Sequence, residues 1–149
     1  MSKSSLHSVI GEAKWAKVFE FNRDRGEFHK DYDGAYTIQV YLDEANMKKH
    51  SASGSRVKPK IDDDGISITY KRKHVNAAVP ALGGAPKVVD SDDQPWDTEN
   101  LIGNGSEVEV FFTVYESKMG KGTRLEGIRV LNPVEYQGSG EGGGTKLPF

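Results

Sequence analysis

Apolar and polar residues alternate along most of this chain, and the alternation indicates an all-β protein. Over Ala35–Leu42, and again over Glu107–Glu116, every second side chain is apolar. Because successive side chains of a strand point to opposite faces of a sheet, each run predicts a strand with one buried face. Weaker alternation predicts three further strands, at Glu12–Phe21, Ile66–Val75 and Thr123–Val134.

One short helix is predicted between these strands. Asp43 is a suitable N-cap for a helix that runs to Lys49, with Glu44 in its first turn. Gly127 lies inside the last predicted strand and indicates a bulge or bend. Five strands, one short helix and no repeated βαβ unit predict a small closed antiparallel barrel, with an open sandwich as the alternative.

Long polar connections complete the predicted domain. Residues 76–100 contain three prolines and a Gly-Gly pair, so we expect no regular structure there. Loops of this length in a small domain are usually functional or disordered. The chain has 149 residues, which suits one domain. We therefore predict a single domain over residues 1–136, followed by a flexible Gly-rich tail over 137–149.

Composition excludes several classes of protein. The chain contains no Cys, which rules out disulfides, zinc–thiolate sites and thiol catalysis and fits a reducing cytoplasm. The N-terminal residues 1–5 are polar and lack the apolar core of a signal peptide, and no apolar run is long enough to cross a bilayer. We expect an intracellular protein that does not associate with membranes.

Charge is segregated along the sequence. The net charge is −2, which is unusual for a protein that binds nucleic acid. Residues 48–89 nevertheless carry a balance of +6 and residues 117–131 one of +3, whereas residues 90–116 carry −8. Because attraction of phosphates depends on the local field, such a chain can form one basic face and one acidic face.

Candidate enzyme and metal sites are weak. Residues 103–106 lack the Lys and the spacing of a phosphate-binding loop and precede a strand, so they are better interpreted as a turn. The acidic runs have the ligand type that Mg²⁺ prefers, but solvated loops explain them as well; these residues are Asp62, Asp63, Asp64, Asp90, Asp92 and Asp93. The His residues show no ligand spacing, and no nucleophile elbow is present. We predict no catalytic residue, no metal and no cofactor.

Aromatic residues interleaved with cations are the most informative feature. Trp15 stands between Lys14 and Lys17, and Tyr115 is predicted to lie across a hairpin from Arg124. Unpaired bases stack on aromatic faces, each worth roughly 1–3 kcal/mol, while Lys and Arg follow the phosphates. The predicted DNA-binding residues are Trp15, Lys17, Phe19, Tyr70, Lys71, Arg72, Lys73, Phe111, Tyr115, Lys121 and Arg124. The alternative is that such aromatics belong to the core, as we expect for Tyr36 and Phe112.

Several motifs of the chain carry a family resemblance. They are Pro95–Asp97, Leu101–Ser106 leading into Val108–Val110, Gly122–Leu131 and Val134–Tyr136, together with Tyr36–Leu42 and Tyr70–Lys73. In these motifs the sequence resembles the phage single-stranded DNA-binding proteins of the OB-fold type, including podovirus-like helix-destabilising proteins. The resemblance implies a five-stranded OB-fold barrel and a non-enzymatic protein that binds single-stranded DNA without reading its sequence.

The resemblance also implies a biological setting. Such proteins protect and organise single strands during phage DNA replication, recombination and repair, in the cytoplasm of the infected bacterial host, as monomers or homodimers. Their acidic tails end in an aromatic residue that docks on replication or recombination proteins. Here Pro148 and Phe149 form such a tip, but Gly138–Phe149 contains a single acid, Glu141. The alternative function is a small phage protein-interaction module that binds no nucleic acid.

Overall fold

A computed structural model describes residues 4–19, 23, 24, 26, 34–76, 83–97, 101–117 and 120–134. Within them the elements are, in chain order, β1 (Ser4–Lys17), β2 (Ala35–Tyr41), α1 (Glu44–Ala52), β3 (Lys60–Asp62), β4 (Gly65–Lys73), β5 (Lys87–Val89), β6 (Glu107–Ser117) and β7 (Gly120–Asn132). The prediction of an all-β protein with one short helix is confirmed. The predicted tail, residues 137–149, lies outside the described residues.

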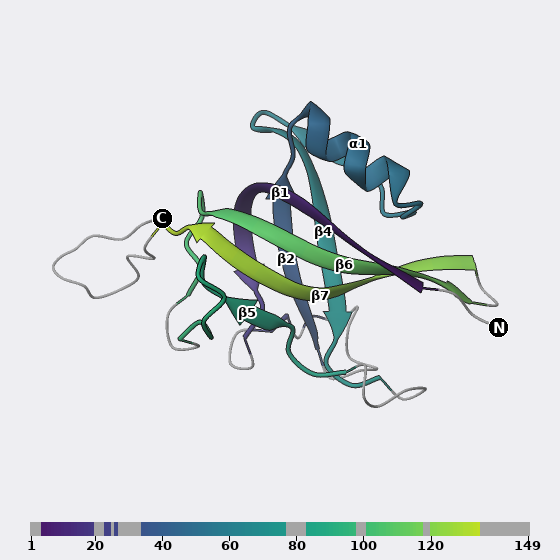
Figure 1. Cartoon of the computed structure of the whole chain (residues 1–149). Helices are drawn as coiled ribbons and strands as arrows, with labels where there is room; N and C mark the ends of the chain where they lie inside the picture. The colour runs from purple at the N-terminus through teal and green to yellow at the C-terminus, as the bar shows by residue number, and fades with distance from the viewer. Residues whose placement is uncertain are drawn as a thin grey trace, which may run out of the picture.

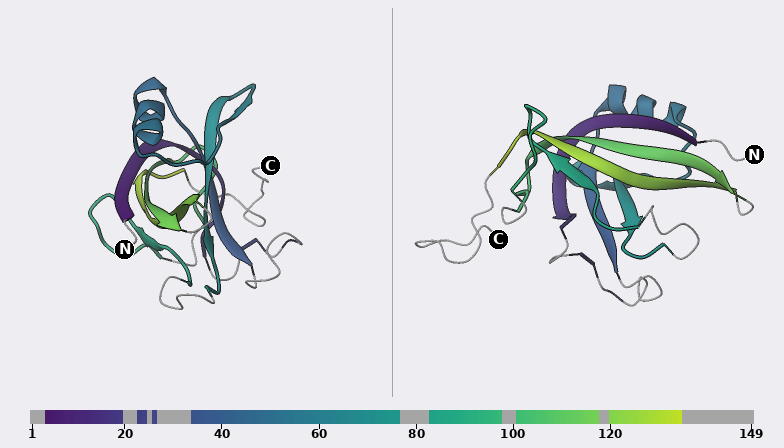
Figure 2. Two further views of the ribbon diagram at one scale, coloured as in Figure 1. Left: turned by 90° about the vertical axis from the view of Figure 1, so that its right-hand side faces the viewer. Right: turned by 60° about the horizontal axis from the view of Figure 1, so that its bottom comes forward.

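The described strands form one seven-stranded sheet in the order β3-β4-β2-β1-β6-β7-β5. Neighbouring strands are antiparallel except β5 and β7, which are parallel. The sheet curls: β1 bends sharply so that it pairs with β6 along its first half and with β2 along its second (Figure 1). Seen from the side, the strands wrap around a common interior, with α1 at one end (Figure 2).

The ladder of hydrogen bonds does not close around this interior, so the prediction of a closed five-stranded barrel is not confirmed. Two three-residue strands, β3 and β5, were not predicted and occupy the two edges. Between β4 and β7 a side chain makes the connection instead. Arg72 on β4 donates from Nη1 to the Leu125 carbonyl oxygen of β7 at 3.2 Å and to Glu126 Oε1 at 3.0 Å.

The core consists of the inward faces of the long strands. Alternation identified most of these faces, because residues two apart on a strand share one side of the sheet, but Ile66, expected to point inward, is 38% exposed. Tyr36 and Phe112 are buried, as predicted. The fully buried set also includes Val9, Ile38, Val40, Ile68, Tyr70, Val108, Val110, Leu125 and Ile128.

Helix α1 begins where the sequence predicts and continues to Ala52. The Asp43 side chain accepts a hydrogen bond from the Asn46 backbone N–H at 2.9 Å, and this bond lowers the pKa of Asp43. His50, in the last turn, is buried, with Nδ1 2.9 Å from the Tyr70 hydroxyl and Nε2 3.2 Å from the Val57 carbonyl oxygen. The Tyr70 contact attaches the helix to β4.

Strand β1 differs most from its prediction. It begins at Ser4 rather than Glu12, and it ends at Lys17, before the predicted limit of Phe21. Pairing with β6 supports the additional N-terminal residues, whose own alternation is weak. The predicted irregularity near Gly127 is confirmed, since the β6–β7 register shifts where Phe111 pairs with Gly127 and Phe112 with Leu125.

Candidate nucleic-acid interface

Lysines gather on the outward side of three adjacent strands. The register places Lys17 of β1 opposite Thr37 of β2, and Thr37 opposite Lys71 of β4. Lys73 lies two residues further along β4 on the same side. All three lysines are exposed. Because neighbouring strands lie about 4.8 Å apart, the three ammonium groups are spaced closely enough to contact successive phosphates of one strand. We call the outward side of β1, β2 and β4 the lysine face.

An acidic turn neutralises one end of the lysine face. Lys14 Nζ lies 2.6 Å from Asp64 Oδ2, and the Tyr41 hydroxyl donates to Asp62 Oδ2 at 2.7 Å. The Asp64 contact raises the pKa of Lys14, and the Tyr41 contact lowers the pKa of Asp62. Lys14 also lies 5.3 Å from the centre of the Tyr41 ring. The other end of the lysine face carries Lys17, Lys71 and Lys73.

Trp15 lies on β1 between Lys14 and Lys17 with 57% of its surface exposed. It occupies an irregularity of β1, where the register with β2 shifts between Lys14 and Lys17. Its backbone N–H donates to Asn104 Oδ1 at 2.8 Å. Such an exposed indole beside lysines is the combination that unpaired nucleotides require, a stacking surface next to cations.

Three predicted DNA contacts have buried side chains, which contradicts the exposure that a direct contact with DNA requires. Phe19 is 3% exposed and belongs to the core: the chain leaves the strand after Lys17, so the alternation no longer applies there. Tyr70 points inward from β4 and contacts His50, and burial raises the pKa of its hydroxyl. Arg72 is 9% exposed, and its guanidinium also donates to the Gly84 carbonyl oxygen at 2.8 Å.

Three of the remaining predicted residues, Phe111, Tyr115 and Arg124, lie on a different surface, the outward side of β6 and β7. As predicted, Arg124 approaches Tyr115, with its guanidinium carbon 5.0 Å from the centre of the ring. Arg124 Nε also donates to Glu126 at 2.8 Å. Gly122 leaves room for the Tyr115 ring, since a Cβ on Gly122 would lie 2.4 Å from it. Lys121, on the same hairpin, is exposed.

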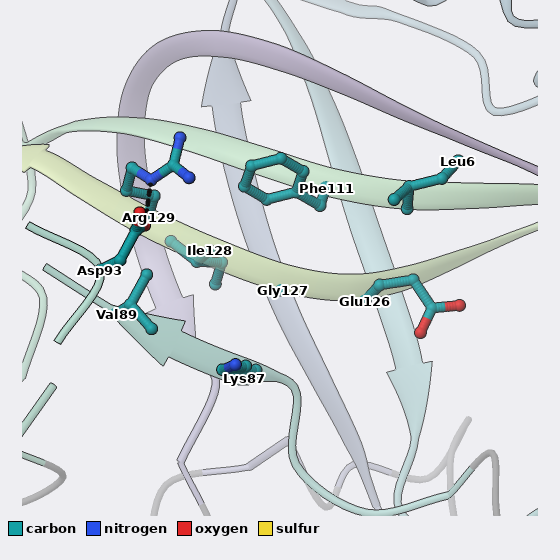
Figure 3. Close-up of a pocket in the computed structure, with 9 residues that line it drawn as sticks. All are labelled: Leu6, Lys87, Val89, Asp93, Phe111, Glu126, Gly127, Ile128 and Arg129. Atoms are coloured by element: carbon teal, nitrogen blue, oxygen red, sulfur yellow. Dashed lines mark hydrogen bonds and ion pairs between the residues drawn. The ribbon is translucent and has the colours of Figure 1, made fainter. Parts of the chain in front are cut away.

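Next to this hairpin, a groove of about 310 Å³ lies along β5, β6 and β7. Phe111 and Leu6 contribute apolar surface, and Arg129 lies 5.4 Å from the centre of the Phe111 ring (Figure 3). Arg129 is held by Asp93 at 2.8 Å and by Glu109 at 2.6 Å. Charges of both signs therefore line the groove.

Three of the six acidic residues considered as magnesium ligands bind other side chains. Asp62 and Asp64 bind Tyr41 and Lys14, and Asp93 binds Arg129. Among the described residues, no three His, Cys, Asp or Glu side chains converge in a way that would hold a metal ion. Within the same part of the chain, no helix has the length and hydrophobicity to cross a membrane.

Comparison with known proteins shows which proteins share this fold. No protein-family model matches the sequence, and no curated protein matches it either. Among solved structures, gp2.5, a single-stranded DNA-binding protein encoded by bacteriophage T7, superimposes with a TM-score of 0.55 at 14% identity, covering 89% of this chain and 94% of its own. The single-stranded DNA-binding protein of bacteriophage Enc34 gives 0.53 at 13% identity, covering 97% and 87%. The chain has the fold of phage single-stranded DNA-binding proteins.

Sequence reasoning missed several residues of the interface. Thr37 and Tyr41 share the lysine face because of the pairing between strands, and pairing is not encoded in local alternation. The sequence places Asn104 in a turn, but its contact with Trp15 spans 89 positions. The candidate partner-binding residues Pro148 and Phe149 lie outside the described residues, and their role stays a prediction.

Proposed function

We propose that this protein binds single-stranded DNA without reading its sequence, through the lysine face and Trp15. The observation that carries the proposal is the cross-strand row of Lys17, Thr37 and Lys71, with Lys73 beside it and an exposed Trp15 two residues before Lys17 in the same strand. The fold shared with two phage single-stranded DNA-binding proteins supports it.

The chemistry of the face favours single strands. Lysines attract phosphates as point charges, and Trp15 offers a surface on which any base can stack. In a duplex the bases already stack on each other and are not available to the indole. Every base has a π face, so this mode of binding distinguishes strandedness but not sequence.

The proposal extends to architecture and biological role. The five long strands β1, β2, β4, β6 and β7 would constitute an OB-fold barrel, in which Arg72 bridges β4 and β7. The protein would protect and organise single strands in phage DNA replication and recombination, in the cytoplasm of the infected host. It would do so as a monomer or homodimer, as a binding protein rather than an enzyme, and replication or recombination proteins would contact Pro148 and Phe149.

A fluorescence titration tests the binding proposal. Oligonucleotides of equal length, single- and double-stranded, are added to the protein, and binding is measured over a range of salt concentrations. We expect clear preference for the single strand. The variant Lys17→Ala/Lys71→Ala/Lys73→Ala should bind more weakly. The slope of log K against log salt should fall by about 0.7 for each phosphate that the variant no longer neutralises.

A charge-matched control separates the lysine face from net charge. Lys48, Lys49 and Lys58 are exposed and lie outside the face, on α1 and the segment after it. Their triple Ala variant changes the total charge equally and should keep the wild-type slope. Equal slopes in the two triple variants would refute the lysine face as the binding site, and equal affinity for duplex would refute the single-strand preference.

The groove along β5, β6 and β7 favours a second function, binding of a protein partner. Leu6, which lines it, is 64% exposed, and apolar surface at a concave site is typical of protein interfaces. This is the alternative of a protein-interaction module without nucleic-acid binding. Failure of the wild-type protein to bind any single-stranded oligonucleotide would favour this second function over the first.

A further inference from the structure

Trp15 has a strained backbone conformation and a largely exposed apolar side chain. Its φ is +53°, in the left-handed region that bulky residues rarely adopt. At the same time 57% of its surface is exposed, so burial in the core does not compensate for the steric strain. Among the described residues, the other non-glycine residue with positive φ is Asp93, a small polar residue that tolerates this region far better. Strained backbone of this kind persists where surrounding contacts impose it, often at functional sites.

The contacts that impose it come from the turn before β6. Because the β1–β2 register shifts between Lys14 and Lys17, the Trp15 N–H donates instead to Asn104 Oδ1 at 2.8 Å. Two backbone hydrogen bonds reinforce the same junction: the Gly105 N–H donates to the Ala13 carbonyl at 2.9 Å, and the Ala13 N–H donates to the Ser106 carbonyl at 2.8 Å.

The same turn is hydrogen-bonded to Val134, two residues after the end of β7. Ser106 is fully buried, and its hydroxyl donates to the Gly103 carbonyl oxygen at 2.8 Å and accepts from the Val134 N–H at 2.8 Å. The Gly103 N–H donates to the Val134 carbonyl oxygen at 3.2 Å. The turn at residues 103–106 is therefore hydrogen-bonded to β1 through Ala13 and to the segment after β7 through Val134. Asn104 belongs to this turn, so the turn fixes the position of the Trp15 backbone.

We propose that Trp15 is a pre-positioned stacking platform for one unpaired base, and that Asn104 is the positioning residue that holds it in the binding conformation. This inference rests on the proposed function and deepens it. A platform fixed before DNA arrives loses less conformational entropy on binding than a mobile one. Asn104 acts through the Trp15 backbone, so its contribution requires no contact with DNA.

The test uses the full chain with Trp96→Phe, which leaves Trp15 as the single tryptophan. Asn104→Ala removes the acceptor oxygen, whereas Asn104→Asp keeps an oxygen in its place. The probe is oligo(dT), added to saturation, and both the quenching of Trp15 and the Kd are measured. We expect Asn104→Ala to lose most of the quenching and to bind about 5- to 100-fold more weakly, the range that removal of one stacked base allows.

Asn104→Asp serves as the rescue variant. It should restore the quenching amplitude, although its added negative charge weakens affinity through repulsion of phosphates. A role of Asn104 in general folding would not produce this pattern, because the amplitude at saturation reports the contact between indole and base. Wild-type quenching in Asn104→Ala would overturn the inference.

A second pair of variants tests the strain without DNA. In an ordinary strand Gly is less stabilising than Ala, but at φ +53° the order should reverse, since Gly adopts this conformation without a clash. Trp15→Gly should therefore melt at a higher temperature than Trp15→Ala, and both should bind oligo(dT) more weakly than the parent. A higher melting temperature for Trp15→Ala would overturn the proposed strain.

The outcomes for the two proposals are distinguishable. If the parent protein does not bind oligo(dT), the proposed function fails. A different pattern would refute the inference alone. In that pattern the parent binds oligo(dT), the Lys17→Ala/Lys71→Ala/Lys73→Ala variant binds more weakly, and Trp15 of Asn104→Ala is quenched as strongly as in the parent. The proposed function would then stand.

Discussion

At the scale of single residues, Lys71, Arg72 and Lys73 are adjacent in β4 but point to opposite sides of the sheet. The two lysines are exposed on the lysine face, whereas Arg72 crosses to β7 beneath it. Its guanidinium makes hydrogen bonds to the Gly84 and Leu125 carbonyl oxygens and to Glu126. A single motif of three cations thus divides into two that can bind a ligand and one that supports the fold.

This division predicts opposite phenotypes for neighbouring substitutions. Arg72→Ala removes the hydrogen bonds to the Gly84 and Leu125 carbonyl oxygens and leaves Glu126 with Arg124 as its remaining arginine partner, and it should lower the free energy of unfolding by about 2–3 kcal/mol. Lys71→Ala removes an exposed side chain and should cost much less stability than Arg72→Ala, but it should weaken DNA binding. Urea denaturation and oligonucleotide titration of both variants check this.

The same two measurements would show if the role given to Arg72 is incorrect. If Arg72→Ala is as stable as the wild type, the bridge between β4 and β7 does not contribute to stability. If it is folded, fully stable and deficient in DNA binding, Arg72 is a DNA contact after all. The conservative variant Arg72→Lys should be intermediate in stability, because Lys cannot reproduce the planar fork of donors.

At the scale of elements, alternation located the long strands to within a few residues except at β1. The limits of β2, β4, β6 and β7 follow from local patterns, because burial of one face determines them. The start of β1, the short strands β3 and β5, and the bulge at Trp15 depend on distant partners. Alternation assigns Phe19 to the exposed face, because the strand is expected to continue to Phe21. Tyr70 is predicted as a DNA contact because it adjoins three cations, although alternation already places its side chain inward.

The contact between α1 and β4 predicts a pH dependence of stability. Burial lowers the pKa of His50 below its ordinary value of 6.5, so the folded protein holds this imidazole neutral. In the unfolded chain His50 takes up a proton near pH 6.5. The unfolded state therefore binds more protons below that pH, and the free energy of unfolding should fall as pH decreases from about 6.5 toward the lower folded pKa.

Urea denaturation between pH 7.5 and pH 5, values that bracket the ordinary pKa of His, measures this effect. His50→Gln keeps a side chain that can hydrogen-bond the Tyr70 hydroxyl but does not titrate. We expect the variant to be less stable than the wild type at pH 7.5 and to lose less stability on acidification. Parallel pH profiles of the two proteins would show that His50 is not the group responsible.

At the scale of the whole molecule, the distribution of charge matters more than its sum. The chain is acidic overall, at −2, yet its sheet presents Lys17, Lys71 and Lys73 on one surface. Four of its acids form ion pairs away from these three lysines: Asp64 with Lys14, Asp93 and Glu109 with Arg129, and Glu126 with Arg72 and Arg124. A net charge computed from the sequence consequently underestimates the attraction between this surface and phosphate.

The C-terminal segment adds almost no charge to this distribution, and that predicts its role. Residues 138–149 contain one acid and one Lys, so they should compete poorly with DNA for the lysine face. Leu147, Pro148 and Phe149 combine an apolar tip with a carboxylate, which suits a partner pocket with an apolar floor and a cationic rim.

Deleting residues 138–149 should therefore leave the Kd for single-stranded DNA nearly unchanged and abolish binding to a replication or recombination partner. Oligonucleotide titration of both forms, with recovery of partners from an extract of infected cells, decides between three outcomes. Tighter DNA binding after truncation would show that the tail competes with DNA, and recovery of the same partners by both forms would show that the tip does not dock.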